Sequence, residues 1–279
     1  MFDVKEVEEQ KQASNSLRFE GLGRQSRLLE RQEHIAEHVL EYGSVAAKDL
    51  ALMFNVSLMT IHRDLDELER QGVLRKLRGA AEAQPSSLFE SNIRHRTRVA
   101  KAEKEALSRH ALSKIEPGQV VMLDDSTTAL PLARLLPSLA PLTVITNFVA
   151  AIRELSGVKG INLISLGGEY LPNHDAFTGV VCEAAIASLH ADVLFMSTSA
   201  VSDCAALHQE QEIVRVKRRM IASAKRRILL VDHTKLGKVA LHHLAPLQDF
   251  DLLIVDEHAD QEMIEELEEC PVPLEIASQ

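Results

Sequence analysis

The chain has 279 residues, of which 46% are hydrophobic and 26% charged, a composition that excludes disordered, collagenous and coiled-coil proteins. No apolar run approaches the roughly 18 to 20 residues of a membrane span, and the N-terminus lacks a secretory signal, so we expect a cytoplasmic protein with no membrane partner. The net charge of -10 would by itself argue against DNA as a partner. However, eleven acids lie from Asp249 onward without any Lys or Arg, so the chain before Asp249 is nearly neutral. We expect that acidic segment to face away from any bound DNA.

Composition and pattern predict four segments. Residues 1–23 are a polar extension, residues 24–80 a small helical domain, residues 81–92 a small-residue linker and residues 93–279 a larger α/β domain. In the small domain, Leu28, Ile35 and Val39 predict an amphipathic helix that ends at Gly43. Helices are also expected over 46–54 and 58–71, and the run VLRKLR at 73–78 predicts a short strand pair. This order is typical of a winged helix-turn-helix.

The third helix has the two faces that a DNA recognition helix needs. Ile61, Leu65 and Leu68 form a core stripe, while Arg63 lies on the opposite face and is a candidate for a bidentate contact to guanine. The acids Asp66 and Glu67 further along would repel phosphate, so only the first turns should enter the groove. The predicted DNA-contacting residues are Ser57, Met59, Thr60, His62 and Arg63 on the helix and Arg75, Lys76 and Arg78 on the wing.

The segment from Val45 to Ala81 resembles the DNA-binding domain of the DeoR family of bacterial transcriptional repressors. The resemblance is carried by Val56-Ser57, by the run Thr60-Ile61-His62-Arg63-Asp64-Leu65, and by Leu68, Gly72, Leu74, Lys76 and Gly79-Ala80-Ala81. Two positions depart from the family pattern, since His62 replaces an Arg and Ala80 replaces a Gly. The resemblance implies a repressor whose partner is double-stranded operator DNA.

The larger segment alternates apolar runs with helical stretches, which predicts a mostly parallel sheet covered on both faces. The expected strands are residues 120–124, 142–146, 161–166, 192–196, 227–232 and 251–256. Because the carboxyl ends of parallel strands meet at one edge, polar residues that follow them should converge on one crevice. Hydroxyls and free amides at such turns, together with lysines, favour a phosphorylated ligand. The predicted effector-binding residues are Asp124, Asp125, Ser126, Thr127, Thr128, Thr146, Asn147, Gly167, Gly168, Gly179, Lys217 and Lys235.

These turns, in this order, also resemble the DeoR family. The resemblance implies a sensor domain similar in fold to ribose-5-phosphate isomerase and CoA-transferase domains, which binds a sugar phosphate or a related metabolite. Our hypothesis is a homo-oligomer, a dimer or tetramer, that represses a sugar or polyol operon, and we expect no cofactor. Departures occur in the ligand loops, where Ser126 replaces a Gly and Met196-Ser197-Thr198-Ser199-Ala200 replaces a Gly-rich stretch. A side chain at such a position narrows the site.

The alternative is a sugar-phosphate isomerase or CoA-transferase-like enzyme with an N-terminal assembly domain. Its general base would be a carboxylate, for which Asp124, Asp125, Glu169 and Asp175 are candidates, but nothing in their spacing singles one out. Ser126 with His174 or His233 lacks a nucleophile elbow, so no catalytic residue is predicted.

Metal and disulfide sites are not expected from the sequence. The pairs His34 with His38 and His242 with His243 lack a third ligand at recognisable spacing, so no metal site is predicted. The three cysteines, Cys182, Cys204 and Cys270, are odd in number and far apart, which argues against a disulfide framework.

Overall fold

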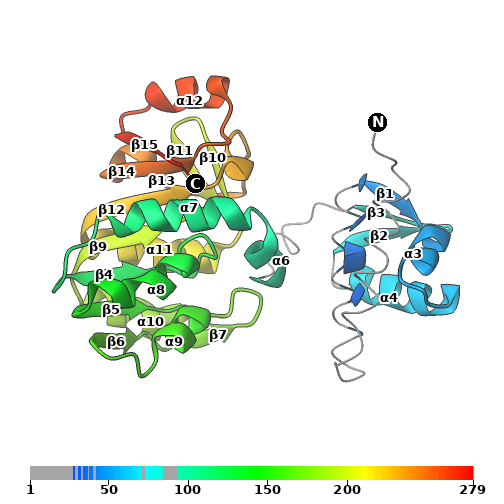
Figure 1. Ribbon diagram of the computed structural model, residues 1–279, viewed down its shortest axis with the longest axis horizontal. Coiled ribbons are helices and arrows are strands. Elements are labelled where there is room, and N and C mark those ends of the chain that lie inside the picture. Colours follow the sequence, from blue (N-terminus) through cyan, green and yellow to red (C-terminus); the bar gives the residue numbers. More distant parts are fainter. Residues whose placement is uncertain are drawn as a thin grey trace. The chain divides into compact units, whose positions relative to one another are not determined.

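The computed structural model describes residues 28, 31–32, 34–36, 38–39, 42–70, 73–83 and 93–278. The chain forms two units, Met1–Glu90 and Ser91–Gln279 (Figure 1). The predicted polar extension, residues 1–23, and most of the predicted linker lie outside the described residues. Within the described parts of the chain, no helix is both long enough and apolar enough to cross a membrane.

The first unit is built from helices packed on a three-stranded antiparallel sheet. The described residues between 28 and 39 are helical, and they are followed by β1 (Ser44–Ala46), α3 (Ala47–Met53), α4 (Leu58–Arg70), β2 (Leu74–Leu77) and β3 (Ala80–Ala83). Ile35 and Val39 of the first helix are buried with Ile61, Leu65 and Leu68 of α4, as the stripes predicted, whereas Leu28 is exposed. The helices of the predicted winged helix-turn-helix are therefore present.

The wing differs from the prediction in its strands. The run at 73–78 is not a strand pair but the single strand β2, and its partner β3 comes from residues 81–83, which were assigned to the linker. Gly79, at φ +83°, makes the turn between them, and Ala81 is buried in the core and so fixes β3. Strand β1, which was not predicted, pairs with β3 and completes the order β1-β3-β2.

The second unit is organised around a seven-stranded parallel sheet of order β15-β14-β12-β9-β4-β5-β6 (Figure 1). All six predicted strands are present, as β4 (Val120–Leu123), β5 (Leu142–Thr146), β6 (Ile161–Ser165), β9 (Ala191–Met196), β12 (Ala224–Val231) and β14 (Leu252–Asp256). Strand β15 (Leu274–Ala277) adds one edge strand that the sequence analysis missed. The parallel pairing of all seven strands confirms the predicted α/β class.

Helices cover both faces of this sheet because successive strand residues point to opposite sides. On one side Leu194 and Leu229 pack with Met220 of α11, and on the other Phe195 and Leu230 pack with Leu107 of α7. The helices are α6 (Ile93–Arg98), α7 (Lys101–Leu112), α8 (Leu130–Leu135), α9 (Val149–Leu155), α10 (Gly179–Ala187), α11 (Gln211–Ala222) and α12 (Gln261–Glu268), with short 3-10 turns η1 (Leu136–Leu139), η2 (His233–Lys235) and η3 (Leu247–Asp249).

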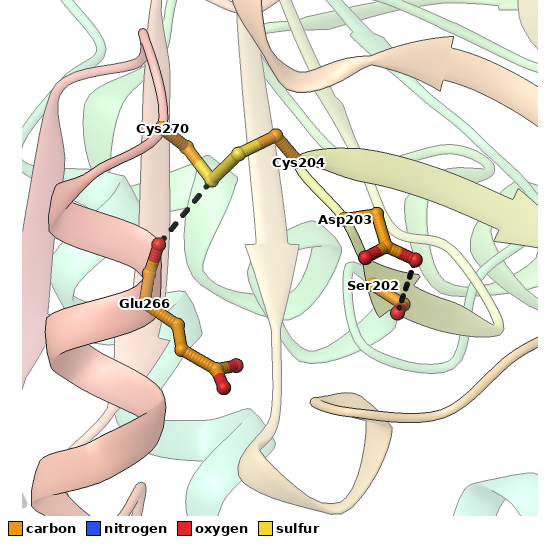
Figure 2. The surroundings of a disulfide bond; sticks show 5 residues. All are labelled: Ser202, Asp203, Cys204, Glu266 and Cys270. Atoms are coloured by element: carbon orange, nitrogen blue, oxygen red, sulfur yellow. Dashed lines mark hydrogen bonds between the residues drawn. A yellow bond between two sulfur atoms is a disulfide. The ribbon is translucent and has the colours of Figure 1, made fainter.

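Two smaller antiparallel sheets lie in the connections between these elements. One pairs β7 (Glu169–Leu171) with β8 (Ala176–Thr178), and the other has the order β10-β11-β13, formed by β10 (Ala200–Ser202), β11 (Ala205–His208) and β13 (His242–Pro246). At the tip of the β10–β11 hairpin, Cys204 forms a disulfide with Cys270, which follows α12 (Figure 2). The expectation of no disulfide was therefore wrong, because the fold brings together two cysteines that are 66 residues apart.

Candidate functional site

The N-terminus of α4 is fixed by Ser57, as the sequence predicted for a capping residue. The hydroxyl oxygen of Ser57 accepts a hydrogen bond from the backbone N–H of Thr60 at 3.2 Å and lies 2.9 Å from the Thr60 hydroxyl. Ser57 is exposed and Thr60 is half-buried. The first turn of α4 thus presents two hydroxyls beside the free amides of the helix end.

The outer face of α4 carries Met59 and Arg63, both exposed. Among the residues that the structure describes, none forms a hydrogen bond or ion pair with the Arg63 guanidinium. The His62 ring is half-buried, and its Nδ1 is buried without a hydrogen-bond partner in the described part of the chain. With respect to the described residues, Arg63 is therefore an unpaired cationic side chain on this helix, flanked by the side chains that the sequence nominated.

Asp64 has a positioning role that the sequence analysis did not assign. Its carboxylate is buried, and it accepts hydrogen bonds from Arg31 Nε at 2.7 Å, Arg31 Nη2 at 3.2 Å and Gln32 Nε2 at 3.1 Å. Because Asp64 follows Arg63 directly, this link to the first helix fixes the orientation of α4 and therefore of Arg63. An acid adjacent to a core leucine, Leu65, is the sequence signal that could have identified it.

The basic residues of the wing differ in their exposure and in whether an acidic side chain already pairs with them. Arg75 and Arg78 are exposed. Lys76 is half-buried, its ammonium group is paired with Asp66 of α4, and its backbone N–H donates to Glu69 Oε1 at 2.8 Å. Lys76 would have to leave Asp66 to contact a phosphate, so Arg75 and Arg78 are the more available phosphate ligands of the three.

In the second unit, the end of β4 meets the end of β9 and the middle of α11. Asp124 accepts hydrogen bonds from the Ser126 N–H at 3.0 Å, from the Ser126 hydroxyl at 2.5 Å and from the Ser197 N–H at 2.9 Å. It is also paired with the ammonium group of Lys217. The Ser126 hydroxyl in turn accepts from the Ala129 N–H at 3.1 Å, so this side chain is held within the β4–α8 turn.

Lys217 is the centre of this arrangement. In the sequence it lies among Arg215, Arg218 and Arg219, a pattern that a solvent-exposed basic face would also give. Lys217 is 2% exposed, and its Nζ lies 3.2 Å from Asp125 Oδ1 and 3.1 Å from the Ser197 carbonyl oxygen. Burial opposes its charge, but the charges of Asp124 and Asp125 outweigh burial and raise the pKa of Lys217. His174 Nδ1 lies 3.0 Å from Asp125 Oδ2, and Lys217 with His174 holds the pKa of Asp125 well below its usual range although burial acts to raise it.

Two further lysines come from other elements to the same turn. Lys235 Nζ donates to Thr128 Oγ1 at 2.7 Å and to Ser197 Oγ at 2.9 Å, and it lies 3.0 Å from Asp232 Oδ2. Lys104 of α7 donates to Thr127 Oγ1 at 3.2 Å and to the carbonyl oxygen of Arg96. We call this group the strand-end cluster; it consists of Arg96, Lys104, Asp124, Asp125, Thr127, Thr128, His174, Ser197, Lys217, Asp232 and Lys235.

Burial changes the acid–base properties of this cluster. It lowers the pKa of Lys104 to about 7, an effect that the neighbouring charge of Lys235 reinforces and that of Asp232 opposes. Burial also lowers the pKa of Arg96 and brings that of His208 well below its usual range. Arg96 Nε and Nη2 and His174 Nε2 are buried without hydrogen-bond partners in the described residues. The cluster therefore holds unpaired donors where a buried anion would be stabilised.

Within the described part of the chain, the remaining predicted effector-binding residues contact neighbouring segments and not the strand-end cluster. Thr146 lies beside Leu123 on the adjacent strand, and Asn147 Nδ2 donates to the Phe177 carbonyl oxygen at 2.9 Å. A Cβ on Gly168, at φ +148°, would lie 2.3 Å from the Thr178 carbonyl oxygen, so only glycine allows this close approach. In the described residues, no hydrogen bond or ion pair joins Thr146, Asn147, Gly167, Gly168 or Gly179 to the strand-end cluster.

Several cluster members were missed from sequence. Arg96 and Lys104 precede the first strand, Ser197 follows the fourth, and His174 lies in the β7–β8 loop. Ser197 was recognisable, since it follows a strand like the other nominated residues. The two basic residues and His174 had no such signal, because only the tertiary fold brings them to the strand ends.

Two family descriptions match this chain. The DeoR-like helix-turn-helix domain matches residues 31–87, and the DeoR C terminal sensor domain matches residues 99–257. The chain belongs to the DeoR family. As a DeoR-family regulator it has a helix-turn-helix that implies DNA binding and a sensor domain that implies binding of an effector.

Known DeoR-type relatives are similar to this chain over most of its length. The HTH-type transcriptional repressor GlcR of Bacillus subtilis (strain 168) is 30% identical, with 90% of this chain and 96% of the relative covered. The L-fucose operon activator of Haemophilus influenzae (strain ATCC 51907 / DSM 11121 / KW20 / Rd) is 29% identical, covering 81% and 91%. These relatives are transcriptional regulators, and so this DeoR-family chain is a regulator and not an enzyme.

The DeoR sensor unit also has a likeness among solved structures. Ribose 5-phosphate isomerase A from Methanocaldococcus jannaschii is 17% identical with a TM-score of 0.36, covering 50% of this chain and 55% of the isomerase. The order and parallel pairing of the strands establish the fold class independently of that likeness.

Proposed function

We propose that this regulator is a repressor of a sugar or polyol operon and that a phosphorylated sugar binds at the strand-end cluster. The observation that carries the proposal is that Arg96 Nε and Nη2 are buried without hydrogen-bond partners among the described residues, at the strand ends where Lys104, Lys217 and Lys235 also lie. A phosphate dianion would accept hydrogen bonds from these unpaired Arg96 donors. Support for a sugar comes from the relative that is an L-fucose operon activator.

The polar groups around the cluster suit the rest of a sugar. Asn147 Oδ1 and His174 Nε2 are buried without hydrogen-bond partners among the described residues. Sugar hydroxyls both donate and accept, so they would satisfy such atoms, whereas an apolar ligand would leave them without partners.

Helix α6 is the element through which effector binding at the cluster would change DNA binding by the first unit. Its Arg96 carbonyl oxygen accepts from Lys104 and from the Thr127 hydroxyl, and its Ile93 N–H donates to Asn173 O at 2.8 Å. An anion that recruits Lys104 and the Arg96 guanidinium would change these contacts, and α6 begins three residues after the first unit ends. A coupling of about 1 to 3 kcal/mol changes operator affinity roughly 5- to 150-fold. We also propose that the regulator is a homo-oligomer, either a dimer or a tetramer.

The proposal is tested by fluorescence anisotropy of the purified protein on DNA from upstream of its own gene. Scrambled DNA of the same length is the control, and both are titrated with and without a panel of sugar phosphates and the corresponding free sugars. Specific binding that is weakened by one phosphate and not by its free sugar is the expected result. Binding without sequence preference, or without response to any phosphate, contradicts the proposal.

Replacing Arg63 with Ala should weaken binding to the operator by about 1 to 3 kcal/mol and relax its sequence discrimination, because the free guanidinium is placed to contact a base edge. Replacing Arg78 with Ala should weaken binding to all DNA and reduce the salt slope by roughly one unit. Anisotropy titrations at several salt concentrations separate the two effects. Unchanged operator discrimination in Arg63→Ala would rule out its assigned role.

Effector affinity should rise as the pH falls from 9 to 7. Burial lowers the pKa of Lys104 to about 7, so this amine is neutral at pH 9 and becomes protonated toward pH 7. A bound dianion favours the protonated form, while a sugar phosphate, with a second pKa of about 6, stays dianionic over this range. Calorimetric titration should show affinity changing by up to about tenfold per pH unit.

The same titration with Lys104→Met should show a much smaller pH dependence. Lys101→Met is the matched control, because Lys101 lies on the same helix and its side chain is 72% exposed. A pH dependence that survives in Lys104→Met would assign the proton uptake to another group.

A further inference from the structure

A group of three side chains outside the strand-end cluster has the ligand atoms of a possible metal site. Glu103 of α7, His233 of η2 and His258 after β14 each offer one ligand atom, and these atoms all lie within 4.8 Å of one another. His258 Nδ1 is 3.6 Å from Glu103 Oε1. In the described residues no other group of three histidine, cysteine or acidic side chains is arranged in this way. The histidine pairs nominated from sequence are not part of it.

Asp256, at the end of β14, holds both histidines in place. Its carboxylate is buried; Oδ1 lies 3.0 Å from His233 Nδ1 and 3.3 Å from His258 Nδ1. The backbone N–H groups of the same two residues donate to this carboxylate at 2.6 Å and 3.0 Å. Metal-binding histidines are commonly oriented by a carboxylate at the ring nitrogen that does not bind the metal. Asp256 is placed to do this for His233 through its Nδ1, and it holds His258 through the backbone N–H.

The donor set defines the class of ion. Two imidazoles and one carboxylate suit a divalent transition metal such as zinc, whereas calcium and magnesium prefer oxygen ligands alone. Two ligands bound to one tetrahedral zinc ion, at roughly 2.0 to 2.2 Å each, are about 3.4 Å apart. His258 Nδ1 and Glu103 Oε1, 3.6 Å apart, already have nearly this spacing, and separations of up to 4.8 Å would close by rotation of the His258 side chain, which is 47% exposed.

We propose that Glu103, His233 and His258 bind one divalent transition-metal ion, with Asp256 orienting the His233 ring and holding the backbone of His258. Three protein ligands leave a position for water or another ligand. The ion would also fix η2, which carries Lys235 two residues after His233, and α7, which carries Lys104 next to Glu103. The site therefore lies next to the strand-end cluster in sequence while using none of its residues.

The test uses the full-length protein without an affinity tag, stripped with EDTA and dialysed free of chelator. Zn²⁺ is titrated calorimetrically, and Co²⁺ is titrated while visible absorption reports ligation by protein side chains. One ion per chain is expected. His233→Gln and His258→Gln should each weaken binding at least about tenfold, and Asp256→Asn by roughly 10- to 100-fold.

His243→Gln is the matched control, because this exposed histidine lies in the same unit but outside the group. Its affinity should equal that of the unchanged protein. Glu103→Gln, which preserves side-chain size, keeps the proposal testable if a histidine variant fails to fold. Absence of stoichiometric binding, or equal affinity in His243→Gln and His258→Gln, overturns the proposal. Neither DNA nor sugar phosphate is present, so this result is separate from the test of the proposed function.

Discussion

Replacing Lys217 with Met should lower the free energy of unfolding of the second unit by about 3 to 5 kcal/mol at pH 7. The substitution keeps the length of the side chain but removes the charge that pairs with Asp124 and Asp125, both about 1% exposed. Two carboxylates would then remain buried without their main counter-charge. Equilibrium denaturation in guanidinium chloride, followed by circular dichroism, measures the difference.

The pH dependence of this variant distinguishes lost charge from lost packing. In the unchanged protein the pKa of Asp125 lies well below its usual range, so its stabilising contribution is present at neutral pH and is lost only in acid. Without Lys217, burial should raise the pKa of the carboxylates, and the variant should regain stability as they take up protons. The deficit at pH 5 should therefore be smaller than at pH 7.

Arg215→Met is the matched surface control for this experiment. Arg215 lies on the same helix and pairs with Glu183 at 3.1 Å, but its side chain is 48% exposed. Its loss should cost no more than about 1 kcal/mol, because solvent screens such pairs. Equal deficits in the two variants, or a Lys217→Met deficit that does not change with pH, would contradict the role assigned to Lys217.

Lys217 also marks the limit of what the sequence predicted about the site. It was nominated for a phosphorylated ligand, but its neighbours Arg215, Arg218 and Arg219 gave the same pattern as a solvated basic face. Only the packing of α11 against the ends of β4 and β9 distinguishes it from them. Strands such as β5 were predictable because a buried parallel strand is a continuous apolar run, a property of local sequence.

Contacts between distant segments account for the rest of what the sequence did not predict. Arg96, Lys104 and His174 reach the strand-end cluster from elements on either side of β4, and no spacing rule connects them to Asp124. Strand β3 was hidden because AAEA reads as a linker until its pairing with β1 and β2 is known. The same reason applies to Cys204 and Cys270, whose separation in sequence conceals that their Cα atoms lie 5.4 Å apart.

Removing the Cys204–Cys270 disulfide should lower the free energy of unfolding by about 4 kcal/mol. The bond closes a loop of 66 residues, and by chain entropy alone a loop of this length restricts the unfolded state by about that amount. It joins the tip of the β10–β11 hairpin to Cys270, two residues after the end of α12 (Figure 2). Guanidinium chloride denaturation of the double variant Cys204→Ala, Cys270→Ala, compared with protein purified without reductant, measures the loss.

Two controls test whether the loss of stability comes from the disulfide: treatment with a phosphine reductant and the variant Cys182→Ala. Reductant should destabilise the unchanged protein to the level of the double variant and should leave the double variant itself unaffected. Cys182→Ala should respond to reductant like the unchanged protein, because Cys182 is a free, buried thiol whose pKa is raised to about 11 by burial. Thiol titration of the native protein should detect neither Cys204 nor Cys270 before reduction and both after it. If both thiols react before reduction, the bond is absent in solution, and the hairpin is held by its strand pairing and by the core packing of Val201 and Ala206.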